Sequence, residues 1–210
     1  MALTLYAESS WTSPWVLHAM VALEEKKLPY KLEVVPYPIP AAQKAQLAQK
    51  ALRGKVPILV DGERWIGESE AISEYLAEQY PFPTHPRLFP ADLGDRARAR
   101  QLMLYVRTAL QALRTERPTT SVFYRPVSEP LTPAGAADAE ELIAVASAAV
   151  KPGATNLFAE WCIADPDLAV ALMRLVANHH PMPEHLVAYA HAQWDRRSVK
   201  KFIAHLPTTR

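Results

Sequence analysis

Residues 54–78 read GKVPILVDGERWIGESEAISEYLAE, and this stretch decides the fold of the first part of the chain. Two short apolar runs, Pro57–Val60 and Trp65–Ile66, flank the dipeptide Asp61-Gly62. Such a dipeptide between two strand-like runs is a strong signal for a tight hairpin turn. Apolar side chains then recur with helical spacing over residues 69–80. The stretch therefore predicts two antiparallel strands followed by a helix.

The residues before this stretch extend the pattern to a mixed α/β unit. Residues 3–6 and 30–35 are strand-like. Between them, apolar side chains share one face of a helix that begins at Pro14, and Ser13 suits the N-cap of that helix. Residues 41–51 are compatible with a further short helix. The predicted order of elements is β-α-β-α-β-β-α.

The second half of the chain has a different character. Residues 81–92 carry four prolines, which is typical of a linker. No strand is predicted from Leu93 onward, and a long amphipathic helix carries apolar side chains as far as Leu113 and ends at Pro118. Further helical stretches lie near residues 133–150, 166–178, 184–194 and 196–205. We therefore predict an α/β domain over residues 1–80, a linker over 81–92, and an all-α domain over 93–210.

Composition and charge exclude several classes of protein. The 210 residues carry 23 Lys and Arg against 22 Asp and Glu, so the net charge of +1 gives no global attraction to nucleic acid or anionic membrane. The longest uncharged run, Ser9–Leu23, is shorter than the roughly 20 apolar residues that span a bilayer. The first ten residues lack the pattern of a secretory signal. A single cysteine, Cys162, fits a reducing compartment, so we expect a cytoplasmic protein, and no metal-binding motif is found.

Three short motifs stand at defined places in the predicted α/β domain. Ser13-Pro14-Trp15 joins the first strand to the first helix, Val56-Pro57 enters the third strand, and Glu68-Ser69 opens the last helix. With these motifs in this order, the sequence resembles the glutathione transferase family over its whole length. Residues 116–119 and 156–165 are similar to segments of bacterial members that have a Ser-Pro-aromatic turn.

The resemblance implies a fold and a site. The fold is that of a glutathione transferase, with a thioredoxin-like N-terminal domain and an all-α C-terminal domain. Ser13 would be the catalytic residue that stabilises the glutathione thiolate, and a cis bond before Pro57 would turn the backbone of Val56 toward the peptide. A carboxylate suits the α-amine of glutathione, and a helix start suits its carboxylate. The implied glutathione-binding residues are Trp15, Lys55, Val56, Pro57, Glu68 and Ser69.

The energetics of thiol activation suit a serine at a helix start. Lowering a thiol pKa from about 8.5 to about 6.5 requires about 2.7 kcal/mol. A helix N-terminus supplies about 0.3–1 kcal/mol, or about 2 when partly buried, and a hydroxyl that donates to the thiolate adds about 1.5–3 kcal/mol. Ser13 would therefore act as a donor and not as a nucleophile. Ser9, Ser10 and Thr12 are rival hydroxyls nearby.

The sequence does not settle which residues form two parts of the substrate site. The glycine carboxylate of glutathione needs a cation, and Lys44, Arg53 and Lys55 are all candidates. The second substrate, a small electrophile or a hydroperoxide, would need an aromatic or apolar pocket between the domains. The residues expected to line that acceptor pocket are Trp11, Tyr105 and Leu110, although the tryptophans of this region could instead only pack a domain interface.

Charged stripes indicate how two copies could associate. At 100° per residue, Arg96, Arg100, Arg107 and Arg114 lie within about 40° of one another on the long helix. Glu70, Glu74 and Glu78 form an acidic stripe on the last helix of the first domain. In glutathione transferases these two helices meet across a dimer axis, so the resemblance implies a homodimer interface that contains Glu70, Glu74, Arg96 and Arg100. The alternative is two solvated faces, and Arg107 and Arg114 could face an anionic substrate.

Two further residues refine the expected chemistry. Serine at position 13 counts against a mechanism that needs a protein thiolate, and Cys162 is expected to be a buried small residue. Cys162 takes the place of the usual capping hydroxyl before Asp165, which we interpret as structural. The sequence thus predicts a cytosolic glutathione transferase of detoxification or oxidative stress, with peroxidase or isomerase activity as further options. The alternative is a non-catalytic binding or assembly module of the same fold.

Overall fold

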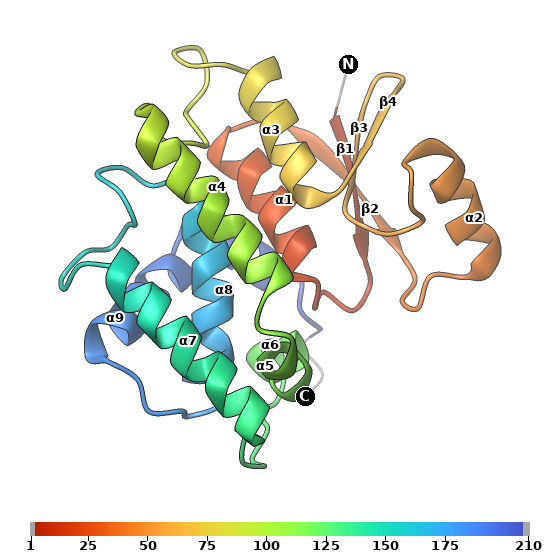
Figure 1. Cartoon of the computed structure of the whole chain (residues 1–210). Coiled ribbons are helices and arrows are strands. Elements are labelled where there is room, and N and C mark those ends of the chain that lie inside the picture. Colours follow the sequence, from red (N-terminus) through yellow and green to blue (C-terminus); the bar gives the residue numbers. More distant parts are fainter. Residues whose placement is uncertain (1–2, 208–210) are drawn as a thin grey trace. The chain divides into compact units, whose positions relative to one another are not determined.

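The computed structural model describes residues 3–207 (Figure 1). This part of the chain forms two compact units: one extends to Leu88 and also includes the segment that begins at Lys201, and the other comprises Phe89–Lys200. The predicted domain ranges 1–80 and 93–210 include residues 1–2 and 208–210, which lie outside the described residues, and these ranges stay a proposal. In the described range, the chain has no helix that is long and apolar enough to cross a membrane.

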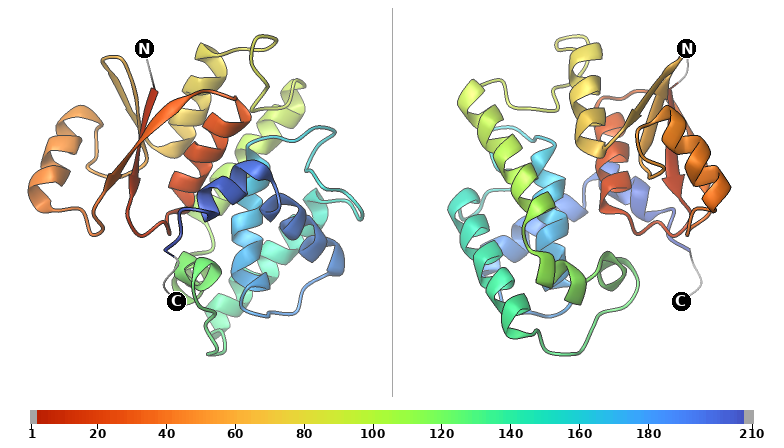
Figure 2. Two further views of the ribbon diagram at one scale, coloured as in Figure 1. Left: turned by 180° about the vertical axis from the view of Figure 1, so that it is seen from behind. Right: turned by 45° about the vertical axis from the view of Figure 1, so that its right-hand side comes forward.

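The first unit contains a four-stranded mixed sheet (Figure 2). The order of the strands is β2-β1-β3-β4; β1 and β2 are parallel, and β3 is antiparallel to both β1 and β4. The predicted hairpin is confirmed, with Gly62 at the turn in the left-handed region at φ 62°. The strands are β1 (Leu3–Glu8), β2 (Tyr30–Val35), β3 (Ile58–Asp61) and β4 (Arg64–Gly67).

Helices cover both faces of this sheet (Figure 1). The helices are α1 (Pro14–Glu25), α2 (Ala41–Lys50) and α3 (Ser69–Gln79). Helices α1 and α3 pack against each other and against the sheet, while α2 covers the opposite face. Successive side chains of a strand alternate between faces. Accordingly, Tyr6 and Ile58 pack toward Leu47 of α2, whereas Leu5 and Leu59, which are both fully buried, face the other way.

The second unit is all-helical in its described residues. Its helices are α4 (Leu93–Thr108), α5 (Gln111–Glu116), α6 (Thr119–Phe123), α7 (Pro133–Ala149), α8 (Ala164–Val176), α9 (Glu184–Trp194) and the start of α10 (Arg197–Ile203). Helix α8 is buried from Ala164 to Leu175 and forms the centre of the core. The predicted four-stranded α/β and all-α architecture is therefore present.

One predicted helix needs correction. The pattern favoured a single helix up to Pro118, but α4 ends at Thr108, Ala109 is extended, and Leu110 lies in the left-handed region at φ 60°. The Thr108 hydroxyl donates to the carbonyl oxygen of Leu104, and the Gln111 amide donates to the carbonyl oxygen of Thr108. These side chains satisfy backbone groups where the helix stops. Leu110 is still buried, which explains why the apolar spacing concealed the break.

Asp165 has the structural role that the sequence indicated. Its carboxylate accepts hydrogen bonds from the backbone N–H of Cys162 at 2.8 Å and of Leu157 at 2.8 Å, and from the Tyr189 hydroxyl at 2.9 Å. The acid thus accepts the N–H of the residue three positions earlier, as the acid of a capping box does. Ile163, the residue that directly precedes α8, makes no side-chain cap bond. Cys162 is fully buried, and burial raises the pKa of its thiol well above the ordinary value. It is an unreactive core residue, as expected.

The described end of the chain, residues 201–207, packs within the first unit, and we call it the C-terminal segment. Lys201 forms an ion pair of 2.6 Å with Glu24. The Trp11 ring stacks on His205 with the ring centroids 4.3 Å apart and meets Phe202 edge-on at 5.6 Å. Burial and the charge of Lys201 lower the pKa of His205, so its ring is neutral at pH 7 and packs as an aromatic group.

Candidate active site

Ser13 lies where the loop after β1 enters α1. It is the N-cap of the helix, and its Oγ accepts a hydrogen bond from the backbone N–H of Val16 at 3.3 Å, with Pro14 in the first turn. The predicted cap is thus confirmed. Within the described residues, the Ser13 hydroxyl proton takes part in no hydrogen bond. The hydroxyl can therefore donate to an anion placed at this helix start, where the helix dipole also favours negative charge.

A buried acid holds the loop that leads to Ser13. The Glu8 carboxylate accepts hydrogen bonds from the backbone N–H groups of Trp11 at 2.8 Å, Thr12 at 2.9 Å and Ser13 at 2.9 Å. The Glu8 side chain ends β1 and is only 3% exposed. Glu8 is not among the site residues predicted from the sequence, although an acid at the end of an apolar strand, directly before a serine-rich turn, is a recognisable signal.

The second motif has the backbone geometry that the resemblance implied. The Val56–Pro57 peptide bond is cis, which confirms that expectation. Val56 is half-buried, and neither its N–H nor its C=O is hydrogen-bonded to any described residue. Buried or half-buried backbone groups are normally paired. A peptide that lies alongside Val56 in an extended conformation would supply both missing partners.

The third motif stands at the start of α3. Glu68 precedes the helix with φ 60° and ψ 118°, a backbone conformation that is uncommon for a residue with a side chain. Its side chain is 59% exposed, and one oxygen lies 3.4 Å from the Arg53 guanidinium. Ser69, the first residue of the helix, is buried. The motif therefore places an accessible carboxylate beside a helix N-terminus, which can bind a cation and an anion next to each other.

The three side chains that could bind the glycine carboxylate differ in their contacts. Arg53 is paired with Glu68, whereas Lys44 and Lys55 are exposed and form no ion pair with the described residues. Lys55 directly precedes Val56 in the loop. Lys44 belongs to α2, and its carbonyl oxygen is packed so closely against Gly54 that a Cβ there would lie 2.1 Å from it.

Two family models match the chain. The model described as the glutathione S-transferase N-terminal domain matches residues 12–79, and the model described as the C-terminal domain matches residues 92–207, which is more than half of the chain. The chain belongs to the glutathione S-transferase family. The N-terminal match spans the Ser13, Val56-Pro57 and Glu68-Ser69 motifs.

A solved structure agrees with this assignment over nearly the whole chain. A glutathione transferase homolog from Burkholderia, described with bound glutathione, is 32% identical and has a TM-score of 0.81. The match covers 97% of this chain and 97% of the homolog. Among curated relatives, glutathione S-transferase U13 of Arabidopsis thaliana is 36% identical over 99 residues, and glutathione S-transferase Z1 is 37% identical over 105. These two matches span only 42% and 45% of the relatives' lengths.

The residues expected in the acceptor pocket of the transferase lie in different surroundings. Trp11 is only 6% exposed because Phe202 and His205 pack on it. Leu110 is 4% exposed and belongs to the helical core. Burial and the charge of Glu141 raise the pKa of Tyr105 well above its ordinary value, so its phenol stays protonated. The acceptor-pocket role of these residues stays a prediction.

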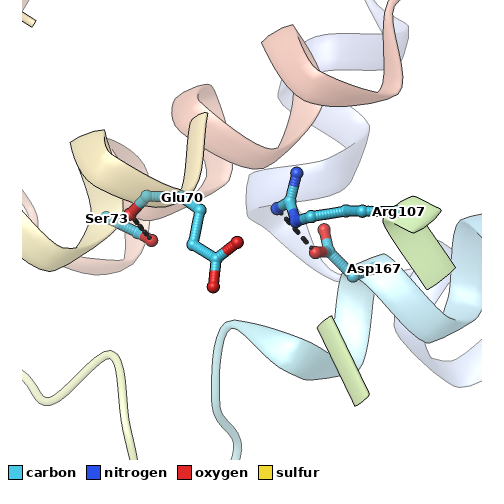
Figure 3. A network of polar contacts seen from close by, with 4 residues as sticks. All are labelled: Glu70, Ser73, Arg107 and Asp167. Atoms are coloured by element: carbon cyan, nitrogen blue, oxygen red, sulfur yellow. Dashed lines mark hydrogen bonds and ion pairs between the residues drawn. The ribbon is translucent and has the colours of Figure 1, made fainter. Parts of the chain in front are cut away.

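Two arginines expected at a transferase dimer interface, Arg96 and Arg100, make contacts within the second unit. Arg96 donates to the carbonyl oxygens of Pro90 and Ala91, both at 3.0 Å, and the Arg100 guanidinium lies 4.6 Å from the centre of the Phe89 ring. In α3, the Ser73 hydroxyl donates to the carbonyl oxygen of Glu70 (Figure 3).

Arg107 has a partner in its own unit. It forms an ion pair of 2.8 Å with Asp167 of α8, with 13% and 3% of the two side chains exposed (Figure 3). The carbonyl oxygen of Arg107 also accepts a hydrogen bond from Arg114. The ion pair of Arg107 therefore joins α4 to α8, and the hydrogen bond from Arg114 joins α5 to α4.

Proposed function

We propose that this chain is a glutathione transferase in which Ser13 stabilises the thiolate of bound glutathione. The observation that carries the proposal is the Ser13 hydroxyl at the N-terminus of α1, whose oxygen is fixed by Val16 while its proton is not used by the described residues. Membership of the family and the glutathione described in the Burkholderia homolog support it. The helix start and the hydroxyl both favour the anionic sulfur.

The tripeptide would lie along the three motifs. Its α-amine would bind the Glu68 carboxylate, and its neighbouring carboxylate would bind the start of α3 at Ser69. The cysteinyl residue would pair with the backbone of Val56 in the manner of an added strand. Lys55 would bind the glycine carboxylate. Trp15 would contribute apolar contact, since its side chain is partly exposed in the first turn of α1.

The chemistry follows from a thiolate held beside a second substrate. The sulfur forms a bond to the electrophilic carbon while the leaving group departs with its electron pair. A hydroperoxide is the second proposed acceptor class: the thiolate takes the terminal oxygen to give a sulfenic acid and an alcohol, and a second glutathione then yields the disulfide and water. We propose that either reaction takes place in the cytoplasm.

Calorimetric titration of glutathione into the folded wild-type protein tests the proposal directly. Saturable binding supports the site and is followed by assays with electrophiles and hydroperoxides. A folded protein that binds no glutathione contradicts the proposal and leaves the fold as a binding or assembly module.

We predict that Lys55→Gln weakens glutathione binding about two- to fivefold, the range for an exposed ion pair. Arg53→Gln, the matched control, should not weaken binding because Arg53 already lies on Glu68. Calorimetric titration of both variants checks this expectation. Weakening by Arg53→Gln alone would reassign the glycine carboxylate to Arg53.

We also propose a homodimer in which Glu70 and Glu74 of one copy face Arg96 and Arg100 of the other. We predict that Arg100→Glu shifts the protein toward monomer at low concentration, since it sets like charges opposite each other. Sedimentation velocity over a dilution series measures this shift, and a variant that stays fully dimeric rules out pairing at this arginine.

A further inference from the structure

The Glu8 carboxylate accepts four hydrogen bonds from residues 10–13, the turn before α1, which we call the Ser13 turn. Besides the three backbone N–H groups of Trp11, Thr12 and Ser13, its Oε2 accepts the hydroxyl proton of Ser10 at 2.5 Å. Four donors therefore occupy the two oxygens of a carboxylate that is almost wholly removed from water. A buried carboxylate is tolerated only when its oxygens are satisfied in this way.

These bonds decide which hydroxyl protons of the turn remain available. Ser10 has one hydroxyl proton, and Glu8 receives it. In the 2.8 Å contact between the Ser10 and Thr12 hydroxyls, Thr12 must therefore be the donor. The protons of Ser10 and Thr12 are both used inside the turn, whereas Ser13 accepts from Val16 and keeps its proton.

The hydrogen bonds to Glu8 also hold the backbone of the turn in an uncommon conformation. Trp11 has φ 51°, a left-handed conformation that bulky residues rarely adopt. Its N–H points to Glu8 and donates both to the side-chain carboxylate, at 2.8 Å, and to the carbonyl oxygen, at 3.3 Å. Without the carboxylate, the N–H groups of Thr12 and Ser13 would lose their acceptor, and Trp11 would keep only the longer bond to the carbonyl oxygen. The turn would then relax toward ordinary backbone conformations.

We propose that Glu8 is the positioning residue of the glutathione site: it fixes the turn and leaves Ser13 as the hydroxyl that faces the thiolate. This inference rests on the function proposed above, and it adds an assignment of roles within the turn. Glu8 acts through Ser13 and does not touch the substrate.

Two effects of Glu8 on the thiolate have opposite signs, which makes the proposal testable. A nearby negative charge by itself disfavours a thiolate, so its removal would lower the pKa of the bound thiol. If the turn relaxed, the Ser13 hydroxyl would no longer donate to the sulfur, and the pKa of the bound thiol would rise. Glu8→Gln changes charge and geometry together, and Glu8→Asp keeps the charge while it shortens the reach.

The experiment measures the pKa of enzyme-bound glutathione from the ultraviolet absorbance of the thiolate, together with kcat and KM. We expect both Glu8 variants to raise the pKa of the bound thiol by about one unit. At a pH well below that pKa, the thiolate fraction is then about tenfold smaller. The main loss should appear in kcat, with KM for glutathione changed less than about twofold, because the polar groups proposed to bind the tripeptide, at Lys55, Val56 and Glu68-Ser69, lie outside the Ser13 turn. Glu33→Gln, which alters an exposed carboxylate on β2, is the matched control.

The outcomes separate this inference from the proposed function. If wild type lowers the thiol pKa and both folded Glu8 variants leave it unchanged or lower it further, Glu8 is not a positioning residue, although the function stands. If Glu8→Gln does not fold, a raised pKa in Glu8→Asp supports the inference and an unchanged one overturns it. A wild type that binds glutathione without lowering its thiol pKa overturns both. A loss in Ser10→Ala as large as in Ser13→Ala would overturn the assignment of Ser13.

Discussion

Ser13→Ala should raise the pKa of the enzyme-bound glutathione thiol by about one to two units. A hydrogen bond to a charged group is worth about 1.5–3 kcal/mol, and one pKa unit corresponds to about 1.36 kcal/mol. Because the thiolate is the reactive form, we expect the activity of the wild type to fall as pH drops through the lowered pKa that Ser13 is proposed to give the bound thiol. The variant should lose activity already at higher pH, with kcat/KM about 10- to 100-fold lower in the acidic limb. Titration of thiolate absorbance and a pH–rate profile measure both effects.

The same substitution also removes the N-cap of α1, so folding must be checked separately. Loss of a cap reduces stability by about 0.5–2 kcal/mol, which a melting curve detects. Ser9→Ala is the matched control, since the Ser9 hydroxyl oxygen binds the backbone N–H of Tyr37 at an exposed position. If Ser9→Ala shows the shift in thiol pKa and Ser13→Ala does not, the donor is Ser9.

Glu68→Gln should weaken glutathione binding by at least tenfold. The substitution keeps the size of the side chain but removes the negative charge that would bind the α-amine. A charge-assisted hydrogen bond of about 1.5–3 kcal/mol corresponds to a loss of about 10- to 150-fold in affinity. Calorimetric titration of glutathione into wild type and variant gives the ratio of the two dissociation constants.

Stability measurements keep this effect apart from folding. The Glu68–Arg53 pair is more than half exposed on both sides, and such pairs add little to stability. The melting temperature of Glu68→Gln should therefore match that of wild type. Glu63→Gln, an exposed acid in the hairpin between β3 and β4, is the control for glutathione affinity. Equal affinity of wild type and Glu68→Gln would show that the amine binds elsewhere.

Local signals made the fold and part of the site predictable from the sequence. Asp61-Gly62 specifies a hairpin turn through its own backbone preferences, and Ser13-Pro14 specifies a helix start in the same way. The cis bond before Pro57 was not derivable from the residues alone, since cis occurs at only about 5–6% of such bonds. That expectation depended on the family resemblance.

The features that were missed depend on backbone conformation or on distant contacts. The break after α4 rests on the left-handed conformation of Leu110, which leaves the apolar periodicity intact. The role of Glu8 depends on three N–H groups, and the pattern of side chains does not reveal where a backbone N–H points. The packing of Trp11 on His205 joins residues from opposite ends of the sequence.

The packing of the C-terminal segment on Trp11 constrains the order in which the first unit can fold during translation. The part of the first unit that ends at Leu88 leaves the ribosome early and can begin to fold while translation continues. Trp11, two residues before Ser13, receives its ring partners Phe202 and His205 only after the helical unit has been translated. A nascent chain arrested before Lys201 should therefore expose Trp11, and Trp11 reaches its final packing only after Phe202 and His205 have been translated.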